Sequence, residues 1–316
     1  MNMRWGKKGA IFKVTKQYKW MHYYASTPVP AFAKPNGRIY FSTRSCQSEN
    51  GNFLSYIGYV EAGKDNFFDL SNTVSLTPAL NLGNPGSFDE FGTMLAEIIP
   101  VEEKLYMYYM GWQRSFTVPY TISIGLAIAN QKDLCFEKYS EGPVMGWSAE
   151  DPYGIGNISI IKEKTKWKMW YTSYLPWIFR DAKYCPTYCI KYAESFDGIN
   201  WKRDNIVCLM PSNDKECVAT PSVIRMNDQY HMWFSYRKIF DYKDGQGSYR
   251  VGYAVSKDGI HWQRDDSKGV DVSKEGWDSN MTAYPYVFSL NKKHYMLYNG
   301  NYFGRDGFGY AELTEE

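Results

Sequence analysis

The chain has 316 residues, and 36 lysines and arginines against 34 aspartates and glutamates give it a net charge of +2. A chain so close to neutral has no overall electrostatic basis for binding nucleic acid or a membrane surface, so we expect neither partner. All-β propellers and barrels of this length often form one domain with a large core. Aromatic residues make up 18% of the sequence, which is typical of strands and of surfaces that stack on sugars.

The N-terminal segment carries basic residues but no apolar stretch and no small-residue cleavage site, so we expect no signal peptide. Of six cysteines only Cys185 and Cys189 lie close together, and no second ligand pair completes a zinc site. We therefore expect reduced, mostly buried thiols, a cytoplasmic protein, and no metal or other cofactor. Carboxylates could still hold a cation, because hard cations prefer oxygen ligands.

Two sets of short apolar and aromatic segments recur along the chain at nearly constant intervals. The first set is RIYFST (38–43), YMYYMG (106–111), KMWYTS (168–173), HMWFSY (231–236) and YMLYNG (295–300). The second set is YIGYVE (56–61), SIGLAI (123–128), CIKYAE (189–194), RVGYAV (250–255) and GFGYAE (307–312). Glycine, asparagine, aspartate and proline bound these segments, as they bound strands, whereas long stretches with helical periodicity are scarce.

The second residue of each first-set segment serves as an anchor for comparing the units: Ile39, Met107, Met169, Met232 and Met296. Five similar units predict an all-β fold, a five-bladed β-propeller formed by residues 1–316 as one domain. The predicted blades are residues 20–80, 81–145, 146–210, 211–272 and 273–316. Segment 9–14 is strand-like and precedes the first blade, so we expect it to complete the last blade and close the ring.

The sequence Ser-x-Asp-Gly-Ile-x-Trp occurs twice, ending at Trp201 and at Trp262. Aspartate and glycine supply turn chemistry and positive φ angles. We interpret both copies as structural turns between the two outer strands of the third and fourth blades.

Acidic residues precede the inner strand of four predicted blades at similar distances from the anchors. They are Asp89, Glu150 with its neighbour Asp151, Glu216 and Asp278. If they converge on one pocket, mutual repulsion would separate their pKa values, which suits glycoside cleavage by one protonated and one ionised carboxyl group. The alternative is that these acids cap loops and bind turn amides.

Arginines, aromatic residues and one histidine complete the set of candidate substrate-binding residues. They are His22, Arg44, Trp112, Arg180, Arg237, Tyr284 and Arg305, with Arg114, Trp147 and Trp177 in neighbouring loops. Several arginines facing one pocket would favour an anionic group such as a sugar carboxylate or a phosphate. Solvated arginines and aromatic packing between blades are the alternatives. His231, His261 and His294 fall within strand or turn segments and are expected to be structural.

These motifs resemble the five-bladed propeller glycosidases of glycoside hydrolase families 43, 32 and 68, with the family 130 phosphorylases as cousins. The resemblance rests on AESFDGINW, AVSKDGIHW, the MWYTS and MWFSYR segments, and the acids ahead of inner strands. It implies a carbohydrate or sugar-derivative substrate. Asp89 matches the role of the family 43 modulator, and Glu150 or Asp151 resembles the general acid.

The first blade offers HYYASTP in place of the family's acid, so the sequence leaves the base or nucleophile open. Glu216, Asp278 or His22 could supply it in a hydrolase that acts on an anionic or nucleotide-linked sugar in polysaccharide metabolism. Phosphorolysis or glycosyl transfer in the same pocket is the second hypothesis, and the arginines suit a phosphate there. A non-catalytic propeller that binds a glycan is the third.

Overall fold

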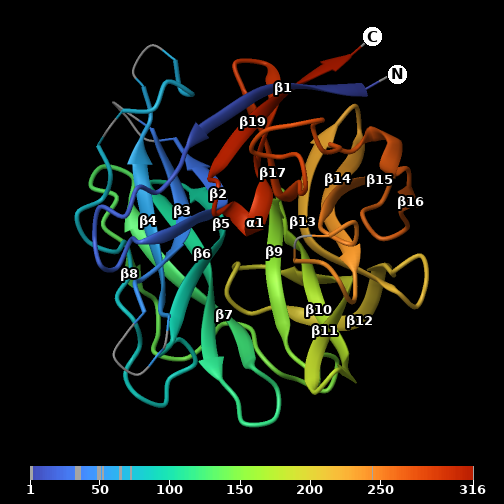
Figure 1. The fold of residues 1–316 in the computed structure, drawn as a ribbon, viewed down its shortest axis with the longest axis horizontal. Helices are drawn as coiled ribbons and strands as arrows, with labels where there is room; N and C mark the ends of the chain where they lie inside the picture. Colours follow the sequence, from blue (N-terminus) through green and yellow to red (C-terminus); the bar gives the residue numbers. More distant parts are fainter. Residues whose placement is uncertain are drawn as a thin grey trace. The chain divides into compact units, whose positions relative to one another are not determined.

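The computed structural model describes residues 3–32, 37–47, 51, 53–63, 66–71, 73–243 and 245–315. Almost all regular structure is β-strand (Figure 1). Two compact units make up the chain. One comprises residues 1–9, 146–303 and 309–316, and the other comprises residues 10–145 and 304–308.

The second of these units contains the first two blades as one seven-stranded sheet in sequential order. Its strands are β2 (Tyr23–Ala31), β3 (Arg38–Arg44), β4 (Ser55–Glu61), β5 (Gly92–Val101), β6 (Lys104–Arg114), β7 (Tyr120–Asn130) and β8 (Glu137–Lys138). All neighbours are antiparallel except β4 and β5, which meet at a single parallel pair, Ser55 with Gly92. This junction separates the two blades.

The other unit contains three four-stranded sheets. Blade three is β9 (Ile155–Lys162), β10 (Trp167–Arg180), β11 (Lys183–Ser195) and β12 (Lys202–Leu209). Blade four is β13 (Glu216–Met226), β14 (Gln229–Lys238), β15 (Arg250–Ser256) and β16 (Gln263–Arg264). Blade five is β17 (Ala283–Leu290), β18 (Lys293–Asn299) and β19 (Phe308–Glu315), with β1 (Met3–Phe12) beside β19.

The N-terminal strand thus lies in the last sheet, as expected, although it spans β1 rather than residues 9–14. Among the described residues, helical structure is limited to a 3₁₀ turn η1 (Asp266–Lys268) and the short α1 (Asn301–Gly304). Tyr302 and Phe303 in α1 have left-handed φ angles of 56° and 61°, so α1 is a tight turn rather than a helix.

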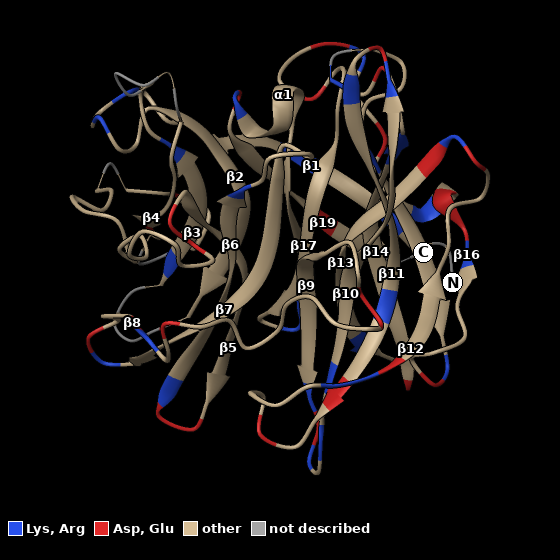
Figure 2. Cartoon of the chain, turned by 90° about the horizontal axis from the view of Figure 1, so that it is seen from below, with Lys and Arg blue, Asp and Glu red and all other residues tan. Residues whose placement is uncertain are grey.

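The recurring sequence segments form strands in every blade, which confirms the prediction that they are strands. The first set lies in β3, β6, β10, β14 and β18, and the second set pairs with it in β4, β7, β11, β15 and β19. Charged residues lie mainly in loops and near strand ends, and most of the strand length is uncharged (Figure 2).

Aromatic and methionine side chains of these strands fill the space between neighbouring blades. One cluster packs Trp170 and Tyr192 of blade three against Met232 and Phe234 of blade four. A second cluster joins blades four and five. Full burial stabilises each such side chain by about 1.5–3 kcal/mol, so packing between sheets is a major part of the fold's stability.

Hydroxyl groups also join one blade to the next. The backbone N–H groups of Leu95, Thr220 and Tyr284 on the first strands of three blades donate to hydroxyls of the preceding blade. The acceptors are Ser42 (2.8 Å), Thr172 (2.9 Å) and Ser235 (2.9 Å), respectively. Thr220 and Tyr284 lie in β-bulges and Leu95 lies directly beside one, where a ladder bond is lost, so the hydroxyls satisfy amides that would otherwise be unpaired.

Both copies of the Ser-x-Asp-Gly-Ile-x-Trp motif form the predicted turns between outer strands. In the first copy, Asp197 Oδ1 accepts the N–H groups of Ile199 and Asn200, each at 2.8 Å. Gly198 has φ +75°, and Gly259 in the second copy has φ +84°, as the turn requires. Although burial opposes it, the hydrogen bonds from Asn200 lower the pKa of Asp197.

Candidate functional site

Four of the five predicted catalytic acids bind a cation from the outermost strand of their own blade. We call this arrangement an acid clasp. In blade two, Asp89 is 1% exposed, and its Oδ2 accepts from Lys138 Nζ on β8 at 2.6 Å. It also accepts from the hydroxyls of Tyr109 and Ser87, both at 3.0 Å. The carboxylate is therefore occupied by groups of its own blade.

Blade five repeats this arrangement with Asp278, which accepts from Lys7 Nζ on β1 at 2.8 Å and from Tyr298 at 2.9 Å. In blade three, Asp151 accepts from Tyr171 and from Arg203 Nη1 on β12, each at 3.0 Å. Burial and the neighbouring aspartate charge raise the pKa values of all three tyrosines, Tyr109, Tyr171 and Tyr298, so each remains a proton donor to its carboxylate.

Blades four and one depart from this arrangement of an aspartate with a tyrosine and a cation. In blade four, Arg264 on β16 binds both oxygens of Glu216, at 2.7 and 3.0 Å, and Phe234 stands two residues after the anchor in place of tyrosine. Burial opposes ionisation of Glu216, but the hydrogen bonds from Arg264 outweigh it and lower the carboxyl pKa. Blade one has no acid, and Met21 and Phe41 occupy the equivalent positions, both fully buried.

The clasp cations were missed by the sequence analysis, although the spacing that identifies them is regular. Lys138 follows Gly125 by 13 residues, while Arg203 and Arg264 follow Lys191 and Gly252 by 12. These reference residues share one place in the second recurring segment. The clasp tyrosines could also have been found from spacing, because each follows its aspartate by 20 residues.

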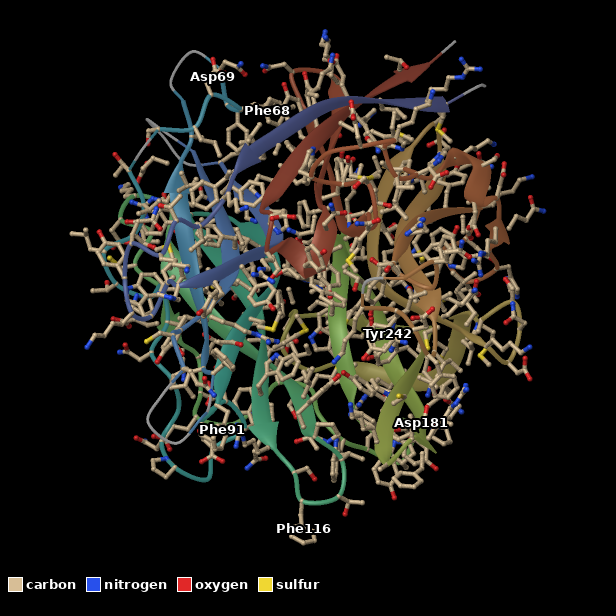
Figure 3. All side chains as sticks on the ribbon, viewed as in Figure 1. Phe68, Asp69, Phe91, Phe116, Asp181 and Tyr242 are labelled. Carbon is tan, nitrogen blue, oxygen red and sulfur yellow. The ribbon has the colours of Figure 1, made fainter. Side chains whose placement is uncertain are left out.

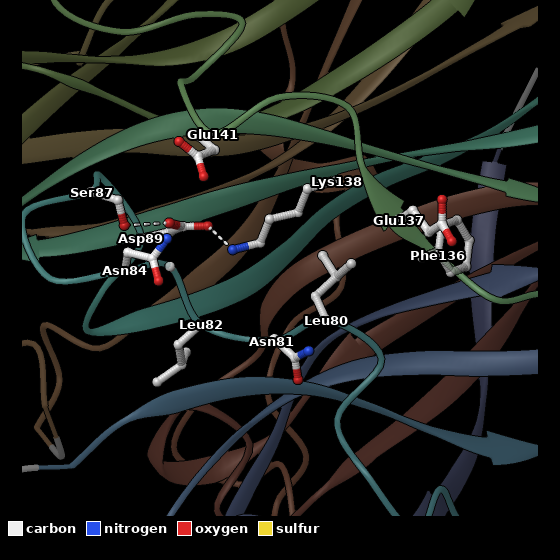
Figure 4. Close-up of a pocket in the computed structure, with 11 residues that line it drawn as sticks. Leu80, Asn81, Leu82, Asn84, Ser87, Asp89, Phe136, Glu137, Lys138 and Glu141 are labelled. Atoms are coloured by element: carbon white, nitrogen blue, oxygen red, sulfur yellow. Dashed lines mark hydrogen bonds and ion pairs between the residues drawn. The ribbon is translucent and has the colours of Figure 1, made fainter.

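The blade-two clasp lies on the wall of a cavity of about 370 Å³ (Figure 4). Segments 80–89 and 136–141 form it, with leucine and phenylalanine side chains beside amides, a hydroxyl and carboxylates. The polar groups include Asn81, Asn84, Ser87 and Glu141. The volume and the mixed lining are those of a site for a small polar molecule.

Blade three differs from the other blades because its aspartate binds a second cation; like blade two, with Asp89 and Glu90, it has two adjacent acids. Lys191 of β11 donates to Asp151 Oδ1 at 3.2 Å and to the carbonyl of Glu150 at 2.5 Å. Arg203 donates in the same way to Asp151 and, at 2.7 Å, to the carbonyl of Gly146. The Ser148 hydroxyl accepts the N–H groups of both acids at 3.2 Å. A buried lysine and a partly buried arginine thus fix the loop 146–154 to the blade.

The same loop presents three side chains that the clasp does not use. Trp147 and Tyr153 are 60% and 43% exposed, which is unusual for side chains of this size. Glu150 is partly exposed, and among the described residues no ion pair holds its carboxylate. A hydrogen bond from Ser148 lowers the pKa of Glu150, so it is ionised near neutral pH. The loop therefore combines a rigid backbone, exposed aromatic faces and an accessible carboxylate.

Arg237 and Tyr284, both predicted to bind substrate, are linked by Tyr249. The Arg237 side chain is 2% exposed, and its Nε donates to the Tyr249 hydroxyl at 3.1 Å. Its Nη atoms donate to the carbonyls of Pro186, Lys238 and Ile239. Tyr284 packs on Tyr249 with ring centroids 5.6 Å apart. Arg237 is thus largely engaged by the protein itself.

The other predicted binding residues have contacts of their own. His22 and Arg44 are joined by a backbone hydrogen bond of 2.9 Å in blade one, where Arg44 lies over the Tyr24 ring. Trp112 packs on Tyr120 in blade two. Arg180 is exposed at the end of β10, Arg114 lies over Phe91, and Arg305 is exposed in the turn after α1.

Within the described part of the chain, no group of three or more histidine, cysteine, aspartate or glutamate side chains is arranged to hold a metal ion. All six cysteines are free thiols, and three of them are buried. No helix among the described residues is long and apolar enough to cross a membrane.

Comparison with known proteins places the chain in a family. It is 33% identical over 314 residues to "Uncharacterized protein Rv1502" of Mycobacterium tuberculosis (strain ATCC 25618 / H37Rv), covering 98% of this chain and 99% of that protein. The chain belongs to the Rv1502 family. A second, local similarity is to beta-1,2-mannobiose phosphorylase of Thermoanaerobacter sp. (strain X514), with 28% identity over 102 residues, or 29% of this chain and 32% of the phosphorylase. No family model matches the chain.

Solved structures share the fold of the family. A structure from work on GH130 mannoside phosphorylases and on hydrolases that target beta-1,2 mannosidic linkages in Candida mannan has a TM-score of 0.70 at 14% identity, covering 98% of this chain and 93% of its own. A thermostable family-43 glycoside hydrolase has a TM-score of 0.63 at 16% identity, covering 92% and 88%. The fold is therefore that of the five-bladed propeller glycosidases and phosphorylases, as the resemblance implied.

Proposed function

We propose that this chain is a carbohydrate-active enzyme that breaks or transfers a glycosyl bond at the loop 146–154, with Glu150 as its reacting carboxylate. The observation that carries the proposal is that the adjacent carboxylates of Glu150 and Asp151 have different surroundings. Asp151 is saturated by four donors from its blade, whereas Glu150 is ionised, accessible and held on the same rigid loop.

The chemistry follows from this geometry. Cleavage of a glycosyl bond develops positive charge at the anomeric carbon, which an adjacent ionised carboxylate stabilises, and the same group can accept a proton from an attacking hydroxyl. Exposed faces of Trp147 and Tyr153 supply stacking surfaces for sugar rings. Two cations beneath the loop fix its backbone, so the carboxylate is positioned before substrate binds.

The test is turnover of a panel of glycosides, with beta-1,2-linked mannosides first because of the local similarity to the mannobiose phosphorylase. Glu150→Gln should lower kcat/KM by about 10²–10⁴-fold. Glu275→Gln is the matched control, because Glu275 is an exposed glutamate in the loop before blade five. Full turnover by Glu150→Gln would exclude the assigned role.

Running each assay with and without inorganic phosphate separates the two reaction types. Turnover that needs phosphate and releases a sugar phosphate identifies a phosphorylase, and phosphate-independent release of reducing sugar identifies a hydrolase.

The cavity of blade two favours a second candidate function, glycan binding without catalysis. Its amides and carboxylates can bind sugar hydroxyls, and its volume suits a monosaccharide. In that case no substrate would turn over, and Asn84→Ala would weaken glycan binding while Glu150→Gln would leave it unchanged.

A further inference from the structure

The segment that leads into β2, residues 16–23, mixes cations with aromatic residues in the order Lys-Gln-Tyr-Lys-Trp-Met-His-Tyr. Two backbone hydrogen bonds hold it beside the residues at the end of β3. The Cys46 N–H donates to the Lys19 carbonyl at 2.8 Å, and the His22 N–H donates to the Arg44 carbonyl at 2.9 Å. The segment is therefore held in place as an extension of the blade-one sheet.

Aromatic rings of this segment meet rings from β4 and from the residues just before it. The Tyr18 ring lies nearly parallel to the Trp20 ring, with centroids 6.1 Å apart and 6° between the planes. Trp20 also meets Tyr56 edge to face at 6.1 Å, and Tyr23 meets Phe53 in the same way at 6.1 Å. We call Tyr18, Trp20, Tyr23, Phe53 and Tyr56 the blade-one strip.

The blade-one strip is fixed and partly open to solvent. Trp20 Nε1 donates to the Leu76 carbonyl at 3.1 Å, and the Trp20 ring packs so closely on Gly58 that a Cβ there would lie 3.3 Å from it. Tyr18 and Trp20 are half-buried, while Phe53 is 44% exposed and Leu76 is 74% exposed. Ring faces that are already fixed lose little conformational freedom when they bind a ligand.

The blade-one strip lies at one end of its blade, and the described acids of that blade lie at the other. Ser55 begins β4 beside the strip, and its N–H donates to the carbonyl of Phe91 at 3.3 Å. Glu61 ends β4, and Phe68 and Asp69 follow it. Figure 3 labels Phe91 at the lower end of the view and Phe68 and Asp69 at the upper end. The strip is therefore separated from both carboxylates by the length of a strand.

The segments that form the strip carry cations and no described carboxylate. Among the described residues from 10 to 60 there are five lysines and arginines and no aspartate or glutamate; Glu49 lies outside the described residues. Three of these cations, Lys16, Lys19 and Arg44, form no ion pair with a carboxylate in the described part of the chain. Unpaired cations beside exposed rings favour a ligand that has both negative charges and rings.

We propose that the blade-one strip binds an acidic polysaccharide, with sugar rings against the aromatic faces and sugar carboxylates beside Lys16 and Lys19. Lys16 is well placed for this role because its Nζ lies 5.8 Å from the centroid of the Tyr23 ring. The inference goes beyond the proposed function, since it concerns binding in blade one and does not involve Glu150.

The orientation of the rings favours a glycan over single-stranded nucleic acid. The ring planes of Trp20 and Tyr56 are turned by 76°, and those of Tyr23 and Phe53 by 74°. Successive nucleobases stack on aromatic faces, and a continuous stack needs faces that are nearly parallel. Sugar rings are turned relative to one another along a polysaccharide, so faces at different angles can each take one ring.

The test is isothermal titration calorimetry of the full chain with oligogalacturonate, which carries one carboxylate per sugar, and with a neutral maltooligosaccharide of the same length. We expect binding to oligogalacturonate that weakens with salt, and much weaker binding to the neutral oligomer. The double variant Lys16→Gln with Lys19→Gln should bind oligogalacturonate about tenfold more weakly. Lys257→Gln with Lys274→Gln is the matched control, because both lysines are exposed outside blade one.

The aromatic part of the proposal has its own variant. Tyr18→Ala should weaken binding about fivefold, because it removes one ring face and leaves every charge in place. Tyr139→Ala is the control, since Tyr139 is 50% exposed in blade two. Glu150→Gln should bind oligogalacturonate as the wild type does, so a failure of the proposed function and a failure of this inference are separate results.

The proposal is overturned if the wild-type chain does not bind oligogalacturonate, or if the double lysine variant and Tyr18→Ala both bind it as the wild type does. Equal binding of the neutral oligomer would also overturn it, because the cations would then have no role. Tighter binding of oligothymidylate than of oligogalacturonate would replace the glycan with single-stranded nucleic acid. Thermal unfolding of the variants checks that any loss of binding does not come from misfolding, and exposed positions tolerate such substitutions.

Discussion

The acid at the start of the first strand has different neighbours in blades three and four. In blade four a single acid, Glu216, is bound through both oxygens by Arg264, and no carboxylate remains for a ligand. In blade three Asp151 takes the corresponding place, and an additional acid, Glu150, stands beside it with its side chain unused by the clasp. Only the loop of blade three adds exposed aromatic side chains, Trp147 and Tyr153.

In both blades the acid at the repeated position has a structural role, because it binds a cation on the last strand of its blade. The clasp links the last strand of a blade to the start of its first strand or to the loop just before it, which no backbone ladder joins directly. A carboxylate that binds the clasp cation is not accessible to a ligand. An accessible carboxylate in the same loop must therefore come from a second acidic residue. Blade two has a second acid as well, but there Glu90 accepts the N–H of Gly86 at 2.6 Å.

The largest effect on stability is expected for Asp151→Asn. It leaves the buried Lys191 and the partly buried Arg203 without their shared counter-charge, and removing one partner of a buried ion pair costs about 3–5 kcal/mol. Urea unfolding measures the change, and Asp181→Asn is the control because Asp181 is exposed at a hairpin turn. A loss smaller than that of Glu216→Gln would contradict the importance of the second cation.

Glu216→Gln should cost less, about 1–3 kcal/mol at neutral pH, because Arg264 is the one cation affected and keeps its ion pair with Asp266 at 2.7 Å. The folded-state pKa of Glu216 lies below its ordinary value of 4.5. Its stabilisation is therefore complete above that value and disappears as the pH falls through the lower folded pKa. Unfolding curves of the wild type and the variant should converge in acid. A difference independent of pH would show that packing, not charge, is responsible.

Tyr109→Phe should cost about 0.5–1.5 kcal/mol, since it removes one hydroxyl that donates to Asp89 while Lys138 and Ser87 remain. Blade four already has phenylalanine at this place, so the ring is accommodated. Thermal unfolding compares this variant with Tyr139→Phe, which changes a tyrosine that is 50% exposed. Equal stability of Tyr109→Phe and the wild type would mean that the cation alone holds the acid.

The smallest effect on stability is expected for Glu150→Gln, within about 0.5 kcal/mol, because its side chain lies outside the clasp. This variant is nevertheless the one expected to lose turnover. A large loss of stability would place Glu150 with the structural acids and remove the distinction between the two blades.

The strands and blades could be predicted because their burial follows a repeated pattern. The anchors Met107, Met169, Met232 and Met296 are all completely buried. Sequence reasoning also found the positions of the acids and both Ser-x-Asp-Gly turns, since these depend on local backbone chemistry.

The roles of the acids could not be predicted in the same way. Glu150 and Asp151 are adjacent, and only the backbone path of their loop decides which one turns toward Lys191 and Arg203. The length of the β10–β11 hairpin was also missed, because its residues continue an ordinary strand pattern. The clasp cations, by contrast, had a regular spacing that a search for cations would have found.

The place of β1 beside β19 has a consequence for biosynthesis. The first strand leaves the ribosome early, but its sheet partner begins only at Phe308, close to the C-terminus. At about 5–20 residues per second, the strand waits tens of seconds with an unpaired edge. Lys7 and Lys8 lie in the middle of β1, and charges on an edge discourage pairing with other chains during such a delay. In the nascent chain the charge of Lys7 would discourage pairing with other chains, and in the folded chain Lys7 binds Asp278.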